Sequence, residues 1–293
     1  MLLSLGLGSQ NLGSQNTITI ASNGATPVAP LSAGGSLLVV APAIVQNGAL
    51  YAPLGTIQLG VSASAPVPSG ITLVGTAPTT NRVTLGAGSL TSVSADGETT
   101  LYGHVQNGTD WIYGLASADP TQTGSQLGIT VVAPPAKQIS LVGANISVAS
   151  GARVDASGGG DLYAGEFVQG TGGSKNIFTS TSSSNVYAVI PGYTGTTPYD
   201  PETSTSGPSL GQQVYLSGVP GLAAGTYTLL PGAYAELPGA FRVTVQIAPG
   251  ASTIGATRSP IATVAQADGS YLASGYMVTP GSGRPTNIGR YSR

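Results

Sequence analysis

Short runs of alternating apolar and polar residues, separated by Gly, Asn, Ser and Pro, constrain the fold of this chain more than any other feature. In Val83-Thr84-Leu85, for example, two apolar side chains flank a hydroxyl. Alternation with a period of two places the apolar residues on one face of a strand. No stretch has the spacing of an amphipathic helix, so we expect an almost entirely β protein. The predicted strands begin at Thr17, Ser36, Ala43, Ala49, Thr56, Ile71, Arg82, Leu90 and Thr99.

An internal repeat indicates how these strands are arranged. The stretch VTLGAGSLTSVSADG, from Val83 to Gly97, aligns with ISVASGARVDASGG, from Ile146 to Gly159. The alignment matches Val83 with Ile146, Leu85 with Val148 and Gly88 with Gly151, and then needs one inserted residue to bring Leu90 opposite Val154. A short strand cannot bury its own apolar face, but copies stacked about 4.8 Å apart build a continuous core. We therefore predict a β-solenoid, with an ordinary β-sandwich as the structural alternative.

The sequence pattern changes near residue 158 and defines three predicted regions. Residues 1–157 are predicted to form β-helix rungs, and residues 158–245 an inserted antiparallel β module rich in Tyr, Pro and Gly. Residues 246–293 are predicted to add further rungs and to end in a polar tail. Pro-Gly steps in the middle region, such as Pro191-Gly192, predict chain reversals because Pro sets the first turn position and Gly accepts positive φ at the second.

Composition excludes several functions. Only 7% of the 293 residues are charged and the net charge is -2, so the clustered Lys and Arg that bind phosphates are missing and we expect no nucleic-acid partner. No apolar run approaches the roughly 20 residues that span a bilayer, so we expect no membrane span. The absence of Cys excludes disulfides, thiolate metal sites and a Cys nucleophile.

Three segments of the chain resemble sequences of the filamentous haemagglutinin family. The members of this family are large bacterial exoproteins of two-partner secretion systems. The segments are ARVDASGGGDLYAGEFVQGTGGS (Ala152 to Ser174), VYAVIPGY (Val186 to Tyr193) and VYLSGVPGLAAGTYTLLPGAYAELPGAF (Val214 to Phe241). The stretch IVQNGALYAPLGTIQLG, from Ile44 to Gly60, looks like that family's repeat, and the whole resemblance covers about Ser36 to Phe241.

This resemblance implies a right-handed parallel β-helix and a role in cell adhesion and virulence. It also implies a secreted or bacterial cell-surface location and an outer-membrane secretion partner for the parent protein. The family's N-terminal secretion domain, with its signal peptide, is not visible in the sequence. We therefore expect the chain to be an internal or C-terminal fragment of a longer exoprotein.

Tyrosines of the middle region are the predicted ligand-binding residues. An aromatic face stacks on a sugar ring, and the phenol hydroxyl can hydrogen-bond to it. The alternative is that about half or more of these tyrosines belong to the core. The predicted contacts to cell-surface glycans or proteins are Tyr163, Tyr187, Tyr193 and Tyr199.

Acidic residues suggest one candidate metal or acid–base site. Asp155, Asp161 and Glu166 lie close together in the sequence with Arg153, a composition that suits either Ca²⁺ or a carboxylate pair. The interpretation that we favour is that Asp155 and Asp161 accept backbone N–H groups in turns. Asp200 and Glu202 form a second, weaker acidic candidate.

Catalytic machinery is not evident elsewhere. His104 is the only histidine and no G-x-S-x-G motif is present, so we expect a surface or rung-corner histidine. We predict no catalytic residues, no metal and no cofactor. The leading hypothesis is a non-enzymatic adhesin segment; the alternatives are a glycan-active β-helix enzyme, either a lyase or a hydrolase, and a purely structural spacer.

Overall fold

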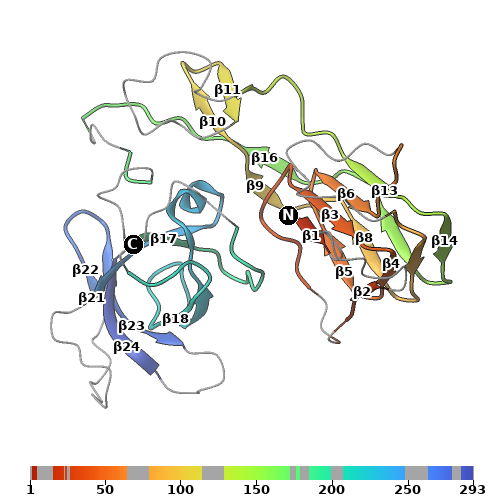
Figure 1. Ribbon diagram of the computed structural model, residues 1–293. Coiled ribbons are helices and arrows are strands. Elements are labelled where there is room, and N and C mark those ends of the chain that lie inside the picture. Colours follow the sequence, from red (N-terminus) through yellow and green to blue (C-terminus); the bar gives the residue numbers. More distant parts are fainter. Residues whose placement is uncertain are drawn as a thin grey trace. The chain divides into compact units, whose positions relative to one another are not determined.

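The computed structural model describes residues 2–4, 16–22, 24, 27–64, 79–113, 129–171, 176–178, 185–198, 207–247, 263–278 and 285–292. The chain divides into two compact units (Figure 1). Unit 1 consists of Met1–Tyr102 and Val132–Leu162, and unit 2 of Gly103–Val131 and Tyr163–Arg293.

The predicted all-β fold is confirmed. Helix is confined, within the described ranges, to the short 3₁₀ segment η2 (Gly232–Glu236). No helix in this part of the chain is long and apolar enough to cross a membrane.

Unit 1 contains parallel sheets whose adjacent strands come from separate parts of the sequence (Figure 1). One sheet has the order β1-β3-β6-β13, a second β14-β7-β4-β2 and a third β15-β8-β5, while β16 pairs with β9. The bounds are β1 (Leu2–Ser4), β2 (Thr17–Ile20), β3 (Ser36–Val40), β4 (Ala43–Gln46), β5 (Ala49–Tyr51), β6 (Thr56–Leu59), β7 (Arg82–Leu85), β8 (Leu90–Ser92), β9 (Thr99–Leu101), β13 (Gln138–Leu141), β14 (Asn145–Val148), β15 (Arg153–Asp155) and β16 (Asp161–Tyr163). The successive runs β3-β4-β5, β6-β7-β8 and β13-β14-β15 visit these sheets in the same order.

The strand register of β7 and β14 is the one that the internal repeat predicts. Val83 lies opposite Ile146 and Leu85 opposite Val148. At the corner that follows, the N–H of Gly88 donates to the carbonyl of Gly151 at 3.3 Å. Both glycines have positive φ, of 76° and 86°, which side chains with a Cβ rarely adopt.

The predicted insertion before Val154 is wrong. Leu90 lies opposite Arg153, and Val154 lies opposite Thr91, so both copies keep the same length through the corner. The corners are closed by equivalent hydrogen bonds, Ser89 N–H to Gly86 and Ala152 N–H to Ala149. The number of residues in the corner therefore sets the register of these strands. The similarity of the apolar side chains Leu90 and Val154 does not.

Apolar side chains of these parallel strands form the core of unit 1. The buried cluster includes Val39, Ile44, Ile57, Leu59, Val83, Leu85 and Val93. Gln46 is also fully buried, and its amide donates to the carbonyls of Gly48 and Leu90 at 3.2 and 3.0 Å. Its Oε1 accepts the N–H of Gly48 at 3.1 Å, so the buried amide is satisfied on both sides.

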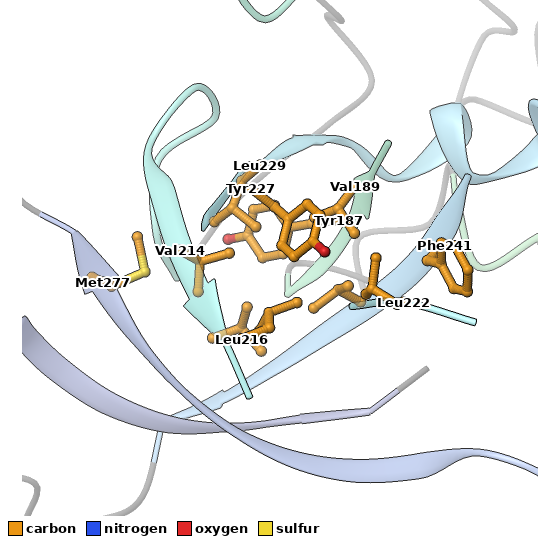
Figure 2. Close-up of a cluster of buried hydrophobic side chains, with 11 residues drawn as sticks. Tyr187, Val189, Val214, Leu216, Leu222, Tyr227, Leu229, Phe241 and Met277 are labelled. Carbon is orange, nitrogen blue, oxygen red and sulfur yellow. The ribbon is translucent and has the colours of Figure 1, made fainter. Parts of the chain in front are cut away.

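Unit 2 contains an antiparallel sheet with the order β19-β18-β23-β24-β21-β17-β20, and β22 pairs with β23. The bounds are β17 (Val186–Val189), β18 (Gln213–Leu216), β19 (Gly225–Thr228), β20 (Leu230–Pro231), β21 (Phe241–Ile247), β22 (Val264–Ala265), β23 (Tyr271–Val278) and β24 (Pro285–Ser292). Its core gathers side chains from β17, β18, β19, β21 and β23, with Tyr187 among them (Figure 2).

The unit boundaries differ from the predicted regions in two places. After residue 246, strands β23 and β24 pair antiparallel with each other and with β18 and β21, instead of adding parallel rungs. The short connection between β23 and β24 explains this, because parallel neighbours need a long crossover.

The second difference lies within the region predicted as rungs. Strands β10 (His104–Gln106), β11 (Asp110–Tyr113) and β12 (Ile129–Thr130) form a small antiparallel sheet that belongs to unit 2. Asn107 and Gly108 both have positive φ, of 55° and 69°, as a tight hairpin loop requires. This loop turns the chain back on itself where a rung would continue.

Candidate ligand-binding pocket

A pocket of about 550 Å³ lies within unit 2. Its volume falls in the range of small-molecule sites, about 300–1,000 Å³. The last residue of β16 and the segments that follow it supply most of its walls, and the end of η2 supplies one side chain. The lining residues are Tyr163, Gly165, Glu166, Phe167, Val168, Gly170, Asn176, Ile177, Phe178 and Glu236.

Large apolar side chains at this pocket are exposed to solvent. The exposed fractions are 36% for Tyr163, 45% for Phe167, 73% for Val168 and 40% for Ile177. Scattered exposed apolar residues are normal, whereas several at one concave site mark a binding surface. The aromatic rings and aliphatic side chains therefore offer an apolar wall to a ligand.

The segment that carries Glu166 is fixed by the β10–β11 hairpin. The N–H of Val105 donates to the carbonyl of Gly165 at 2.8 Å. The N–H of Gly108, in the hairpin loop, donates to both carboxylate oxygens of Glu166 at 3.1 Å each. A carboxylate that accepts a backbone N–H makes a charge-assisted hydrogen bond, so Glu166 holds the hairpin loop beside the pocket wall.

A side-chain hydrogen bond also orders a second segment that lines the pocket, residues 176–178. The N–H of Phe178 donates to Oδ1 of Asn176 at 2.9 Å. This bond closes a turn that places Asn176, Ile177 and Phe178 along the same pocket.

Glu236 brings a second carboxylate to the pocket from a distant part of the sequence. It is the last residue of η2, and its carboxyl carbon lies 3.0 Å from where a Cβ of Gly165 would stand. Only a glycine at position 165 leaves room for the carboxylate in this position. Among the described residues, no hydrogen bond or ion pair reaches this carboxylate, and burial raises its pKa.

The pocket combines two carboxylates with aromatic and aliphatic walls. None of its described lining residues is basic. Such a site can stack a ring against Tyr163 or Phe167 and accept hydrogen bonds through Glu166, Glu236 and Asn176. Its chemistry suits a small ligand that has both an apolar face and hydrogen-bond donors.

Among the tyrosines predicted from the sequence, Tyr163 lies in the pocket. Tyr187 is fully buried in the core of unit 2 (Figure 2). Its hydroxyl donates to the carbonyl of Pro208 at 2.6 Å, and burial raises its pKa to about 12. Its ring has no exposed face for a ligand. Tyr187 therefore fits the alternative interpretation, in which many of these tyrosines belong to the core. Tyr193 is half-buried and donates to the carbonyl of Thr196 at 2.7 Å. Tyr199 lies outside the described residues.

The acidic cluster predicted around Arg153 does not converge on one site. Asp155 accepts the N–H and the hydroxyl of Ser157 at 3.0 and 2.5 Å, which confirms its turn-capping role. These bonds, with the Arg153 guanidinium 3.9 Å away, hold the pKa of Asp155 below its usual value. Asp161 makes no such bond within the described part of the chain, so the same prediction for Asp161 is wrong.

No group of three or more potential metal-binding side chains converges in the described ranges. Glu166 instead accepts the N–H of Gly108 in the β10–β11 hairpin loop. Asp200 and Glu202 lie outside the described residues. His104 is half-buried on β10 opposite Ile112, where burial lowers its pKa, and it does not lie at a rung corner.

Sequence reasoning missed most of the pocket wall. Glu236, Val168, Ile177 and Phe178 were not predicted as site residues, because no motif links the end of η2 to the segment after β16. The signal that was present is the pair of aromatics at positions 163 and 167 in a glycine-rich stretch.

Comparison of the chain with protein-family models, curated proteins and solved structures finds no match. The resemblance to filamentous haemagglutinins therefore rests on the sequence segments alone.

Proposed function

We propose that this chain is a non-enzymatic segment of a secreted or cell-surface adhesin of the filamentous haemagglutinin type. In this proposal it binds ligands on host or neighbouring cells, and the parent protein is exported by an outer-membrane partner. The sequence resemblance supports the lineage, and the exposed aromatic pocket of unit 2 supports the binding role.

Unit 1 is, in this proposal, part of a right-handed parallel β-helix that acts as a rigid support. The repeated order of strands through the three sheets supports this architecture. The matched glycine corners at Gly88 and Gly151 support it too, since each turn of a solenoid repeats the corners of the one before. Every added turn would lengthen the support by about 4.8 Å.

The observation that carries the binding role is the exposure of Tyr163 and Phe167 at one pocket. Leaving aromatic rings in water forgoes part of the stabilisation that burial would give, roughly 25 cal/mol per Å². A glycan would cover this apolar wall with a sugar face, while Asn176 and Glu166 would accept hydrogen bonds from its hydroxyls.

Adhesion through such a pocket would depend on many copies. A pocket that is open to solvent gives modest affinity for one ligand, because only part of the ligand is desolvated. Many copies on one cell surface raise the overall avidity by 10²–10⁴-fold, as is general for linked sites.

A glycan array tests the proposal. We expect the full chain to bind a subset of glycans and the double variant Tyr163→Ala/Phe167→Ala to lose at least about tenfold in affinity for them. Tyr113→Ala is the matched control, because Tyr113 is an exposed tyrosine of unit 2 that does not line the pocket. Equal binding by the double variant would contradict the pocket assignment.

The same array separates the alternatives. A purely structural spacer predicts that no glycan binds. A glycan-active enzyme predicts that bound glycans are shortened during incubation, with the Glu166 and Glu236 carboxylates as the acid–base candidates. The first result would overturn glycan binding by the pocket, and the second would overturn the non-enzymatic adhesin.

A further inference from the structure

Among its described lining residues, the pocket of unit 2 has acidic side chains and no basic one. Glu166 and Glu236 contribute carboxylates, and no described lining residue contributes a cation. Glu166 has the N–H of Gly108 as a partner, but no partner of the Glu236 carboxylate is found among the described residues. A partly buried carboxylate without a partner is costly, because burial removes water without a compensating charge or donor.

Aromatic rings line the same pocket. Tyr163 and Phe167 come from one segment and Phe178 from another, and all three line the space that the carboxylates also border. The face of an aromatic ring carries negative electrostatic potential and attracts an ammonium group within about 6 Å of its centre. Carboxylates and ring faces therefore favour the same sign of charge in a ligand.

We propose that this pocket selects ligands that carry an organic ammonium group, from an amino sugar or a lysine side chain. The inference rests on the proposed function, since it names the chemical class of ligand for the same site. The ammonium group would pair with Glu236, and the carbon skeleton of the ligand would pack on Tyr163 and Phe167. A neutral sugar would leave the Glu236 carboxylate without a counter-charge and would bind more weakly.

Sugars that share one ring but differ in charge, together with a lysine probe, test the selection. Glucosamine, N-acetylglucosamine and glucose share one ring, and Nα-acetyl-lysine amide carries the same ammonium group on a chain. In calorimetric titrations of the full chain at pH 7, we expect glucosamine to bind at least about tenfold more tightly than glucose or N-acetylglucosamine. If the lysine probe binds about as tightly as glucosamine, the pocket recognises the ammonium group on either carbon skeleton. If only glucosamine binds, the ligand is an amino sugar. Both results support the selection for an ammonium group.

Variants locate the charge that is responsible. Glu236→Gln keeps the shape of the side chain and should reduce glucosamine affinity to that of glucose. Asp268→Asn is the matched control, because it removes one negative charge from unit 2 outside the pocket while its amide oxygen can still accept from Ser270. Trp111 is the only tryptophan of the chain, and its fluorescence reports whether each variant keeps a folded unit 2.

A second variant displaces the carboxylate without removing its charge. The φ of Gly165 lies outside the left-handed region, so alanine fits the backbone there, but its Cβ would meet Oε2 of Glu236. Gly165→Ala should therefore weaken glucosamine binding while glucose binding changes little.

The outcomes of the two proposals are distinguishable. Equal affinity for glucosamine and glucose, or no binding of any probe, would overturn the ammonium selection. Neutral glycan binding that depends on Tyr163 and Phe167 would still support the adhesin. Conversely, selective glucosamine binding by a chain that adheres to no cell would support the ammonium site and overturn the adhesin.

Discussion

At the scale of single residues, burial decides which tyrosines are available to a ligand. Tyr163 and Tyr187 are both tyrosines in glycine-rich β sequence, and the sequence alone ranks them equally as ligand contacts. The structure leaves Tyr163 36% exposed and buries Tyr187 completely, with its hydroxyl bonded to Pro208. A residue's type therefore indicates what it can bind, while its position in the sheet decides whether it can.

Gln46 makes a testable contribution at this scale. Its amide satisfies the N–H and carbonyl of Gly48 and the carbonyl of Leu90 inside unit 1. Gln46→Leu keeps most of the volume but removes these three hydrogen bonds and leaves the Gly48 N–H without its Oε1 acceptor, at about 1–3 kcal/mol for a buried group left unsatisfied. We expect the unfolding free energy of unit 1 to fall by at least about 1 kcal/mol in chemical denaturation followed by circular dichroism.

The control for Gln46 is Gln138→Leu, because Gln138 is exposed on β13. An exposed substitution of this kind changes stability by about 0.5 kcal/mol or less. Equal unfolding free energies for the two variants would show that the buried amide bonds contribute nothing.

At the scale of elements, the glycine corners set the register of the parallel strands. Gly88 and Gly151 follow equivalent strands, both have positive φ, and a hydrogen bond joins them. The sequence repeat predicts this pairing correctly, since the corner glycines are the most constrained positions of the repeat. The match of Leu90 with Val154 is wrong because the length of the corner, and not the similarity of the two side chains, sets which residues pair.

Gly151→Ala tests the corner. Its Cβ would have room, since the nearest atom is 3.8 Å away, but φ is 86°. An L-residue in this region costs roughly 1–2 kcal/mol, and we expect the denaturation midpoint of unit 1 to fall accordingly. Gly35→Ala is the control, because its Cβ would also have room, with no atom within 4 Å, while its φ is not in the left-handed region. Similar midpoints for the two variants would rule out a conformational role for Gly151.

At the scale of the whole molecule, short strands and repeats predict the all-β class and the parallel sheets of unit 1. They do not predict that residues 103–131 and 246–293 belong to unit 2. Both segments alternate like the parallel strands of unit 1, and alternation alone does not distinguish a parallel neighbour from an antiparallel one. The connection decides, as the loop at Asn107-Gly108 shows.

The pocket follows from this long-range assembly. The end of β16 and the segment after it supply Tyr163 and Phe167, the β10–β11 hairpin fixes Glu166, and η2 supplies Glu236. Only the first of these contributions is local in sequence, so motif reading finds the aromatics and misses the carboxylate of Glu236.

Adhesion to cells tests the central claim most directly. Beads coated with the full chain, with the Tyr163→Ala/Phe167→Ala variant or with the Tyr113→Ala control are counted on a cell monolayer under flow. We expect the wild-type and control beads to adhere equally and the double variant to retain less than about a tenth of that number, because multivalency amplifies the loss at each pocket. Undiminished adhesion by a folded double variant would contradict the claim that this pocket mediates binding.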